Sequence, residues 1–483
     1  MDRARIIAAC GSIIIRSGEE DEQMRKKLGV VIASMLLLGT AAGCGSNDKA
    51  GSGAESSASS ASQQASPNAS DTGGEQSAPA DGADSEAFTI TVSSWNLADE
   101  PLGIVKAYRE AFENVYKQKY LNATIKYNNT PGDKYFDLLK AQLASASAAD
   151  VIQFQPSHLP MFTTAGFLAD LSDLSLVSSL EGAMKTEVTY QDKVYAIPFD
   201  ISTNGVWYNR KLFEDNGVTP PATWDELLAV ADKFKGMGIT PFAGGFKDAW
   251  VSSMTVKTFT MNDYSSPTFE EEVYNGSKKL NGPEMQATFD KLQLFYDRGY
   301  FGPDAMSNGW DLQRKAFEDG KAAMIIHGSY IAGLVNSEMQ DKGGMETGFF
   351  PLPNDDGAPV LSVGSDTLTG VNAKTPNLQR AKDLVAAMHD AEAQTIRDKD
   401  AGVFPALKGI DIEYKELGNH DFQRALAETD SLLGGQYVPA SVYDVYGKLF
   451  TKIMAGKTFD PAWLDEADQA YAQDKSLLPP PGQ

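Results

Sequence analysis

Hydrophobic positions alternate between two periods along most of the chain. Residues 88–95, FTITVSSW, are rich in β-branched side chains and are typical of a strand, and apolar positions at helical spacing follow over about 100–120. The pattern repeats with a strand at 123–127, a helix near 133–146 and a strand at 150–154. This alternation predicts βαβ units around a mainly parallel sheet, so the expected fold class is α/β.

A passage between two lobes is predicted at residues 194–209, VYAIPFDISTNGVWYN. Two short strand-like runs there are interrupted by Pro198 and by Asn204-Gly205. Beyond it, Thr223 and Glu226 have the spacing of a capping box at the start of a helix. Later elements are expected as helices near 285–298 and 310–319, strands near 321–327, 348–351 and 360–371, and mostly helix to about 471.

A different apolar pattern precedes the folded part. The basic cluster Arg25 to Lys27 leads into the apolar residues 28–43, a stretch that is short for a membrane-spanning helix and has the layout of a secretory signal. Residues 41–43, Ala-Ala-Gly, resemble the bacterial lipobox before Cys44, although that motif favours Leu at the first of these positions. We predict that Cys44 carries a lipid. The alternative is an ordinary signal peptide, with Cys44 incidental.

The residues on either side of this signal fit an exported lipoprotein. An acidic patch at 19–22 directly precedes the basic cluster, so translation is expected to start at Met24. Residues 45–86 contain no Val, Ile, Leu, Met or aromatic side chain and cannot form a core. As a flexible coil, this tether has a root-mean-square span of about 36 Å. The Pro-rich residues 476–483 are expected to form a tail.

Composition restricts the classes of partner and fold. The net charge is −23, which argues against nucleic acid and anionic lipid headgroups as partners. With Cys10 in the leader, the mature chain has no thiol pair, and the four histidines show no metal-binding spacing, so no metal or cofactor is expected. Stability must then come from a large core, and residues 87–483 are long enough for about two domains.

Catalytic motifs are missing from the sequence. It contains no P-loop, no GxSxG elbow and no dinucleotide-binding glycine pattern after a strand. A pair of carboxylates for glycoside hydrolysis stays open, because such a pair needs a separation in space and no sequence motif.

Aromatic and amide side chains stand at predicted strand ends, where open α/β sheets bind ligands. Trp95 and Asn96 end the first strand, and Gln153 and Gln155 flank the end of the third. Two glutamines are unexpected in a buried parallel strand unless they face a cleft. The alternative for Gln155 is a loop amide with its own partner.

Three further residues stand near the predicted passage or in loops. Asp200 follows Pro198-Phe199 and could accept hydrogen bonds from vicinal hydroxyls, or could cap a turn. Trp250 and Tyr330 are large aromatics without a periodic partner, whose alternative role is core packing. Aromatic faces with carboxylates and amides at the rim match sugars, which present C–H groups on their faces and hydroxyls at their edges.

Four segments carry a resemblance to a known family, at 150–171, 195–227, 316–330 and 349–357. There the chain is similar to the extracellular solute-binding proteins of carbohydrate ABC importers, the family 1 group that includes maltodextrin-binding protein. The resemblance covers nearly all of residues 88–483. It implies the type II fold of periplasmic binding proteins, which has two lobes, hinge crossings and a central cleft.

The resemblance also implies where a ligand is contacted. The implied ligand-binding residues are Trp95, Asn96, Asp99, Glu100, Gln155, Ser157, Asp200, Trp250, Trp310, Tyr330, Asp366 and Phe404. Trp250 and Tyr330 match the two stacking aromatics of the second lobe. The loop at Gln155 carries neutral groups where maltodextrin binders have charged ones, so the preferred sugar can differ.

We therefore expect a monomeric, lipid-anchored receptor outside the cell that binds a sugar and passes it to a permease by hinge closure. The expected lobes are 87–199 with 361–405, and 200–360 with 406–475. Two alternatives stay open. One is a lipid-anchored carbohydrate-active enzyme, and the other is the same fold with a peptide, polyamine or metal as cargo.

Overall fold

The computed structural model describes residues 84–97, 103–130, 134–264, 268–339, 345–355, 359–429, 431–433, 435 and 437–478. The predicted signal, Cys44, residues 45–83 of the tether, Asp99 and Glu100 lie outside these residues. The last tether residues, 84–86, are described, and the carboxylates of Asp84 and Glu86 accept from Arg380. In the described part of the chain, no helix combines the length and the apolar character that a membrane span requires.

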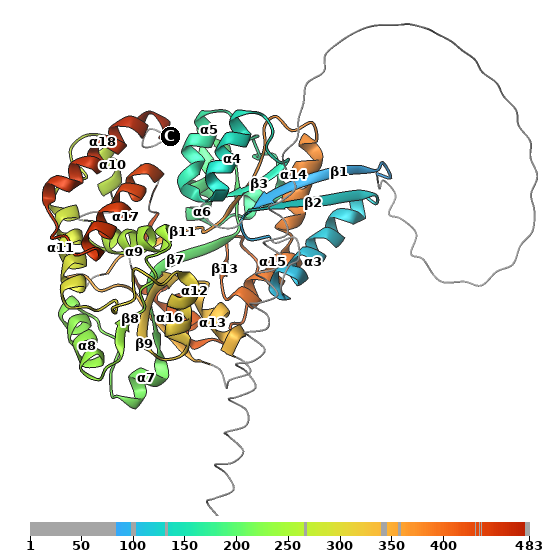
Figure 1. The fold of residues 1–483 in the computed structure, drawn as a ribbon. Coiled ribbons are helices and arrows are strands. Elements are labelled where there is room, and N and C mark those ends of the chain that lie inside the picture. The colour runs from blue at the N-terminus through green and yellow to red at the C-terminus, as the bar shows by residue number, and fades with distance from the viewer. Residues whose placement is uncertain are drawn as a thin grey trace, which may run out of the picture. The chain divides into compact units, whose positions relative to one another are not determined.

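The first sheet has the strand order β2-β1-β3-β12-β6. Figure 1 shows its strands β1, β2 and β3 next to one another. β1 (Phe88–Ser94) is parallel to β2 (Ala123–Asn129) and to β3 (Val151–Phe154). The helices α3 (Gly103–Lys119) and α4 (Lys134–Ala144) connect these strands in sequence, which confirms the predicted βαβ pattern. β12 (Leu368–Val371) is antiparallel to β3 and to β6 (Ile197–Pro198).

Helices from the C-terminal part of the chain pack on the same sheet. α14 (Leu378–Met388) and α15 (Ala391–Ala401) both lie against α3. The Tyr108 hydroxyl of α3 donates to the Met388 carbonyl oxygen over 2.8 Å, and the Tyr116 hydroxyl donates to the Arg380 carbonyl oxygen over 3.0 Å. The chain therefore leaves this sheet after β6 and returns to it with β12.

The second sheet has the order β14-β11-β7-β9-β8. β7 (Asp200–Asn209) is antiparallel to every strand it pairs with. The other strands are β8 (Thr240–Phe242), β9 (Ala322–Gly328), β10 (Thr347–Phe350), β11 (Leu361–Gly364), β13 (Phe404–Pro405) and β14 (Ser431–Leu433). The chain passes between the two sheets at 199–200, 365–367 and 402–403.

The predicted break at Asn204-Gly205 is wrong, because β7 runs through it without interruption. Gly205 pairs with His327 of β9. A Cβ atom on Gly205 would lie 2.4 Å from the Phe349 ring, so the glycine admits an aromatic ring over the strand. The missing side chain serves close packing here, and no turn is formed.

Four helices surround the core of the second sheet, namely α8 (Trp224–Gly236), α9 (Ala249–Asn262), α11 (Pro283–Asp297) and α17 (Ala440–Met454). The predicted capping box is confirmed, since the Glu226 N–H donates to the Thr223 hydroxyl oxygen and the Glu226 carboxylate accepts from the Thr223 N–H. Trp224 is buried and stacks on Phe295, as expected of a packing residue.

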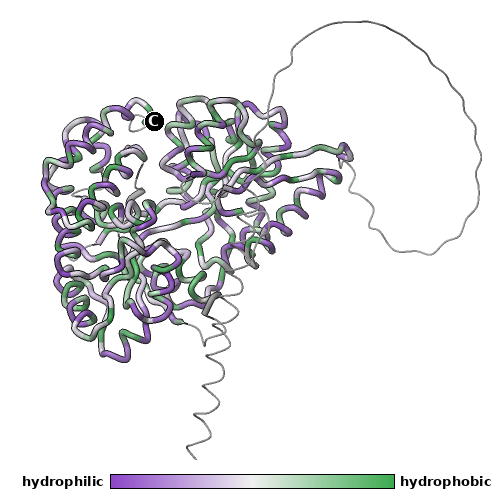
Figure 2. Tube along the Cα trace, viewed as in Figure 1, coloured by the Kyte–Doolittle hydropathy of each residue, from purple (hydrophilic) through white to green (hydrophobic). Residues whose placement is uncertain are grey.

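The other α-helices and strands of the described residues complete the two lobes. They are α5 (Leu159–Thr164), α6 (Gly182–Val188), α7 (Arg210–Asp215), α10 (Phe269–Tyr274), α12 (Trp310–Glu318), α13 (Ile331–Met339), α16 (Leu417–Glu428), α18 (Asp465–Asp474), β4 (Thr189–Tyr190) and β5 (Lys193–Val194). Along the outer helices, hydrophobic and hydrophilic residues alternate (Figure 2), as expected for helices with one face against a core.

Candidate functional site

Aromatic side chains from three elements meet beside the second sheet. Trp250 lies in the first turn of α9, Trp310 is the first residue of α12, and Tyr330 follows β9. The ring centroids of Trp250 and Trp310 are 5.6 Å apart, and those of Trp310 and Tyr330 are 6.3 Å apart. All three side chains are half-buried. The structure thus brings together the three aromatic residues that the sequence proposed for the second lobe.

His327 lies between these rings, and sequence reasoning missed it. Its ring centroid is 4.3 Å from that of Trp310 and 4.9 Å from that of Tyr330. It is fully buried, which lowers its pKa to about 3, and its Nδ1 accepts from the Gly328 N–H over 3.0 Å. The imidazole is therefore neutral and acts as a fixed spacer for the aromatic rings. Its position at the end of the apolar run 322–326 was the available signal.

Polar edges of the three aromatic residues are open. The indole nitrogens of Trp250 and Trp310 and the hydroxyl group of Tyr330 make no hydrogen bond to any described residue. None of these atoms is fully buried. Unpaired donors at the rim of accessible rings are suited to a ligand that offers both an apolar face and hydroxyl groups.

Carboxyl groups lie beside Tyr330. The Asp200 carboxylate accepts from the Asp366 backbone N–H over 2.9 Å, so these two residues are adjacent. Burial and the Asp200 charge raise the pKa of Asp366 to about 6. Burial also raises the pKa of Tyr330 well above its usual value, with smaller contributions from Asp366 and Asp200. Tyr330, Asp200 and Asp366 therefore share one electrostatic neighbourhood.

Asp200 is tied into the passage between the sheets. Its carboxylate accepts from Arg397 of α15 over 3.2 Å, and Arg397 also donates to the Phe199 carbonyl oxygen and to Asp398. Burial raises the pKa of Asp398 to about 7 although Arg397 opposes this. The Asp200 side chain is almost completely buried, so much of its hydrogen-bonding capacity is used within the protein.

The residues predicted on the first sheet lie at the ends of their strands. Trp95 is half-buried against the rings of Tyr135 and Phe136, and Asn96 is exposed. Gln155 and Ser157 are half-buried, and their side chains make no hydrogen bond to a described residue. Their contact with a ligand stays a prediction.

Two other residues are buried within the protein. Gln153 was expected to face a cleft, but it is buried and its Oε1 accepts from the Ser94 hydroxyl over 2.7 Å. Phe404 is buried against the rings of Tyr414 and Phe422.

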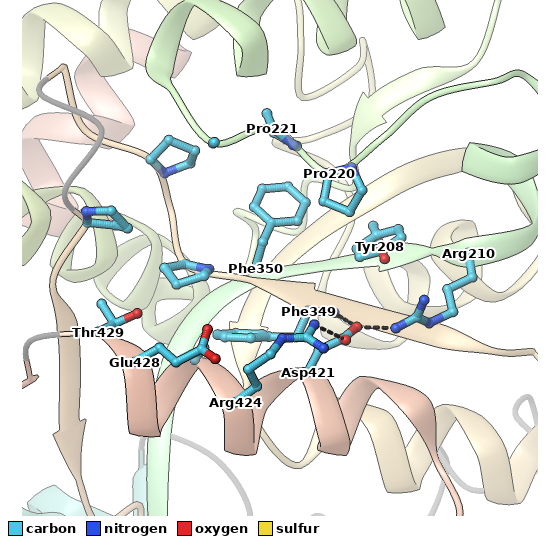
Figure 3. A pocket seen from close by; sticks show the side chains of 15 residues that line it. Tyr208, Arg210, Pro220, Pro221, Phe349, Phe350, Asp421, Arg424, Glu428 and Thr429 are labelled. Carbon is cyan, nitrogen blue, oxygen red and sulfur yellow. Dashed lines mark hydrogen bonds and ion pairs between the residues drawn. The ribbon is translucent and has the colours of Figure 1, made fainter.

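A separate cavity of about 430 Å³ lies between β7, β10 and α16 (Figure 3). It contains none of the predicted site residues. Asp421 accepts from both Arg210 and Arg424 there, so these charges compensate each other. We place the candidate site at the aromatic cluster, because its polar groups are open.

Comparisons with known proteins agree with this fold. The family described as bacterial extracellular solute-binding protein matches residues 99–395. A multiple sugar-binding protein from Streptococcus mutans is 26% identical over 338 residues, which cover 68% of this chain and 77% of the relative.

Solved structures show the same architecture. A chitin oligosaccharide binding protein superposes with a TM-score of 0.70 at 20% identity, over 80% of this chain and 99% of that one. A RafE solute-binding protein in complex with raffinose gives 0.67 at 19% identity, over 80% of this chain and 100% of that one. The fold is therefore the two-lobed type II α/β fold. The chain belongs to the family of bacterial extracellular solute-binding proteins.

Proposed function

We propose that this protein is a lipid-anchored extracellular receptor that binds a mono- or oligosaccharide and delivers it to an ABC permease by hinge closure. The observation that carries the proposal is the cluster of Trp250, Trp310 and Tyr330, whose rings are accessible and whose N–H and O–H groups have no partner among the described residues. The sugar-binding relatives support the choice of ligand.

Hinge closure follows from how the chain connects the sheets. We propose that the lobes rotate about the passages at 199–200, 365–367 and 402–403, with the sugar bound by both lobes in the closed state. Gln155 and Ser157 would then contact the sugar from the first lobe. Ligand contacts made only in the closed state shift the population towards it.

A sugar panel tests the binding function. In a thermal-shift screen of raffinose, stachyose, chitooligosaccharides and xylooligosaccharides, at least one sugar should raise the melting temperature, because a ligand of the native state stabilises it by mass action. Incubation of that sugar with the protein should leave it intact. Cleavage products detected by chromatography would favour a carbohydrate-active enzyme, and stabilisation only by peptides or polyamines would favour a different cargo.

The anchor is tested in the cell. With Cys44 intact, the protein should fractionate with membranes and incorporate labelled palmitate. The Cys44→Ser variant should lose the label and appear in the soluble extracellular or periplasmic fraction. Equal membrane attachment of both forms would contradict lipidation at Cys44, and the family relationship would be unaffected.

A further inference from the structure

One stripe of α9 is less buried than the rest of the helix from Val251 onward, although Ser253 within it donates to the Tyr443 carbonyl oxygen of α17 over 3.5 Å. Trp250, Ser253, Met254 and Lys257 are half-buried, and every other residue from Val251 to Asn262 is buried. These positions are spaced i, i+3, i+4 and i+7, so they share one face of the helix. Lys257 therefore lies on the same side of α9 as Trp250, about 10 Å further along the helix axis.

Lys257 is a cation with open donors. It makes no hydrogen bond and no ion pair with a described residue, and its ammonium nitrogen lies over the Tyr443 ring, 5.5 Å from the ring centroid, and close to Gly435. Burial lowers its pKa, and the carboxyl groups of Glu270, Glu187 and Asp366 oppose this shift. The ammonium group thus lies in an acidic surrounding without direct contact to any of these carboxylates.

Two of the three carboxylates are already held by protein donors. Glu187 accepts from the Ser365 hydroxyl over 2.7 Å and from the Ser365 N–H over 3.1 Å. Glu270 accepts from the backbone N–H groups of Gly435 and Tyr437 over 2.8 and 3.0 Å.

Asp366 differs from both. Among the described residues, its side chain accepts only a long hydrogen bond of 3.4 Å from Thr367, and the residue is half-buried. α9 packs against β11, and β11 ends two residues before Asp366. Lys257 and Asp366 are therefore a donor and an acceptor of opposite charge on neighbouring elements, and neither side chain is completely buried.

We propose that Lys257 is a ligand-binding residue of the solute site, and that its ammonium group donates to oxygen atoms of a solute that Asp366 also contacts. This inference rests on the proposed function. A solute that reaches from Trp250 to Lys257 covers two helical turns and is longer than one pyranose ring, so Lys257 favours an oligosaccharide over its component monosaccharide.

Calorimetric titration with the sugar of the panel that stabilises the wild-type protein most tests this role. Lys257→Met keeps an unbranched side chain that is one atom shorter and removes the donors. We expect it to weaken binding of that oligosaccharide by about 10- to 100-fold, the range for a hydrogen bond to a charged group. Its component monosaccharides, which are too short to reach from Trp250 to Lys257, should bind both proteins equally, and the melting temperature without sugar should not fall.

Lys448→Met is the matched control, because Lys448 is exposed on α17. It should bind like the wild-type protein. The double variant Lys257→Met with Asp366→Asn should lose less affinity than the sum of the single losses, because both side chains hold one ligand.

Equal affinity of Lys257→Met and wild-type protein for the oligosaccharide would overturn the role of Lys257 and leave the proposed function standing. Failure of the wild-type protein itself to bind any sugar would overturn both.

Discussion

Trp250 combines two properties that a core residue does not have together. Its ring contacts Trp310 and His327, yet the side chain is half-buried and its indole N–H is unpaired among the described residues. Packing on one side fixes the ring, and the open side offers area for stacking. Rigid aromatic side chains of this kind carry a large share of binding energy at interfaces.

Replacing Trp250 with Ala should weaken sugar binding by about 1–3 kcal/mol, because a stacking surface is lost. Titration calorimetry measures the change. Trp463→Ala serves as control, since Trp463 packs against Phe459 and Lys452, and it contacts none of the three clustered rings. An unchanged affinity of Trp250→Ala would remove Trp250 from the site.

Burial of the single residue His158 makes the stability of the protein depend on pH. Its ring stacks on Phe136 at 4.9 Å, and burial lowers its pKa to about 4. The unfolded chain has a histidine pKa of about 6.5, so between these values only the unfolded state takes up the proton. The free energy of unfolding is therefore unaffected above pH 6.5 and falls as the pH drops towards 4.

His158→Phe should remove this loss. Relative to pH 7, the wild-type protein should lose about 2 kcal/mol more than the variant at pH 5, because one unit of pKa shift corresponds to about 1.4 kcal/mol. Urea unfolding at both pH values measures the difference. His420→Gln is the control at an exposed position. Parallel acid curves for His158→Phe and wild-type protein would contradict the assignment.

At the scale of elements, the start of α8 is a feature that the local sequence predicted and the structure confirms. Thr223 and Glu226 satisfy backbone N–H groups at the helix start, and both contacts come from residues close in sequence. β7 shows the opposite case, because Gly205 was expected to end a strand. Its neighbours Phe349 and His327 come from distant parts of the chain, so no local pattern could reveal that the strand continues.

Thr223→Ala should lower the free energy of unfolding by about 1 kcal/mol, since a helix N-terminal N–H group loses its acceptor. Chemical denaturation gives the value. Thr223→Ser keeps the hydroxyl and should stay within a few tenths of a kcal/mol of the wild-type protein. Equal losses for the two variants would show that the methyl group, and not the cap, stabilises the helix.

For the whole molecule, Arg397 links the two sheets. It extends from α15, which packs on α3, to Phe199 and Asp200 at the start of β7. Asp398, completely buried, also accepts from it. One guanidinium group therefore compensates two buried carboxyl groups at the passage from the first sheet to the second.

Arg397→Met should destabilise the protein by about 3–5 kcal/mol, because both carboxyl groups would stay buried without their partner. Thermal or denaturant unfolding measures this loss. Arg424→Met is the control, since the Arg424 side chain is 62% exposed and its loss should cost less than about 1 kcal/mol. Similar stabilities of Arg397→Met and Arg424→Met would mean that the buried network contributes little.

The site was predictable in its aromatic part and less so in its charged part. Trp250 and Tyr330 were predicted because large aromatics at loop and helix starts lack periodic partners, and Trp310 was implied by the family resemblance. The structure brings the three together. His327 and Lys257 carried no such mark. A buried histidine and a helical lysine are unremarkable in sequence, and their importance appears only when rings and carboxyl groups from other elements surround them.

The sequence by itself determined the α/β class, the parallel order of β1, β2 and β3 and the start of α8, because these depend on hydrophobic period and on hydrogen bonds between near neighbours. Only the tertiary structure decided which polar groups are open. Gln153 accepts a hydrogen bond from Ser94, and Asp200 accepts one from Arg397. Asp366 and Lys257, in contrast, can still form hydrogen bonds to a ligand. The partners in the two hydrogen-bonded pairs lie 59 or more residues apart in the sequence. Residues so far apart produce no local sequence pattern from which the contact could be predicted.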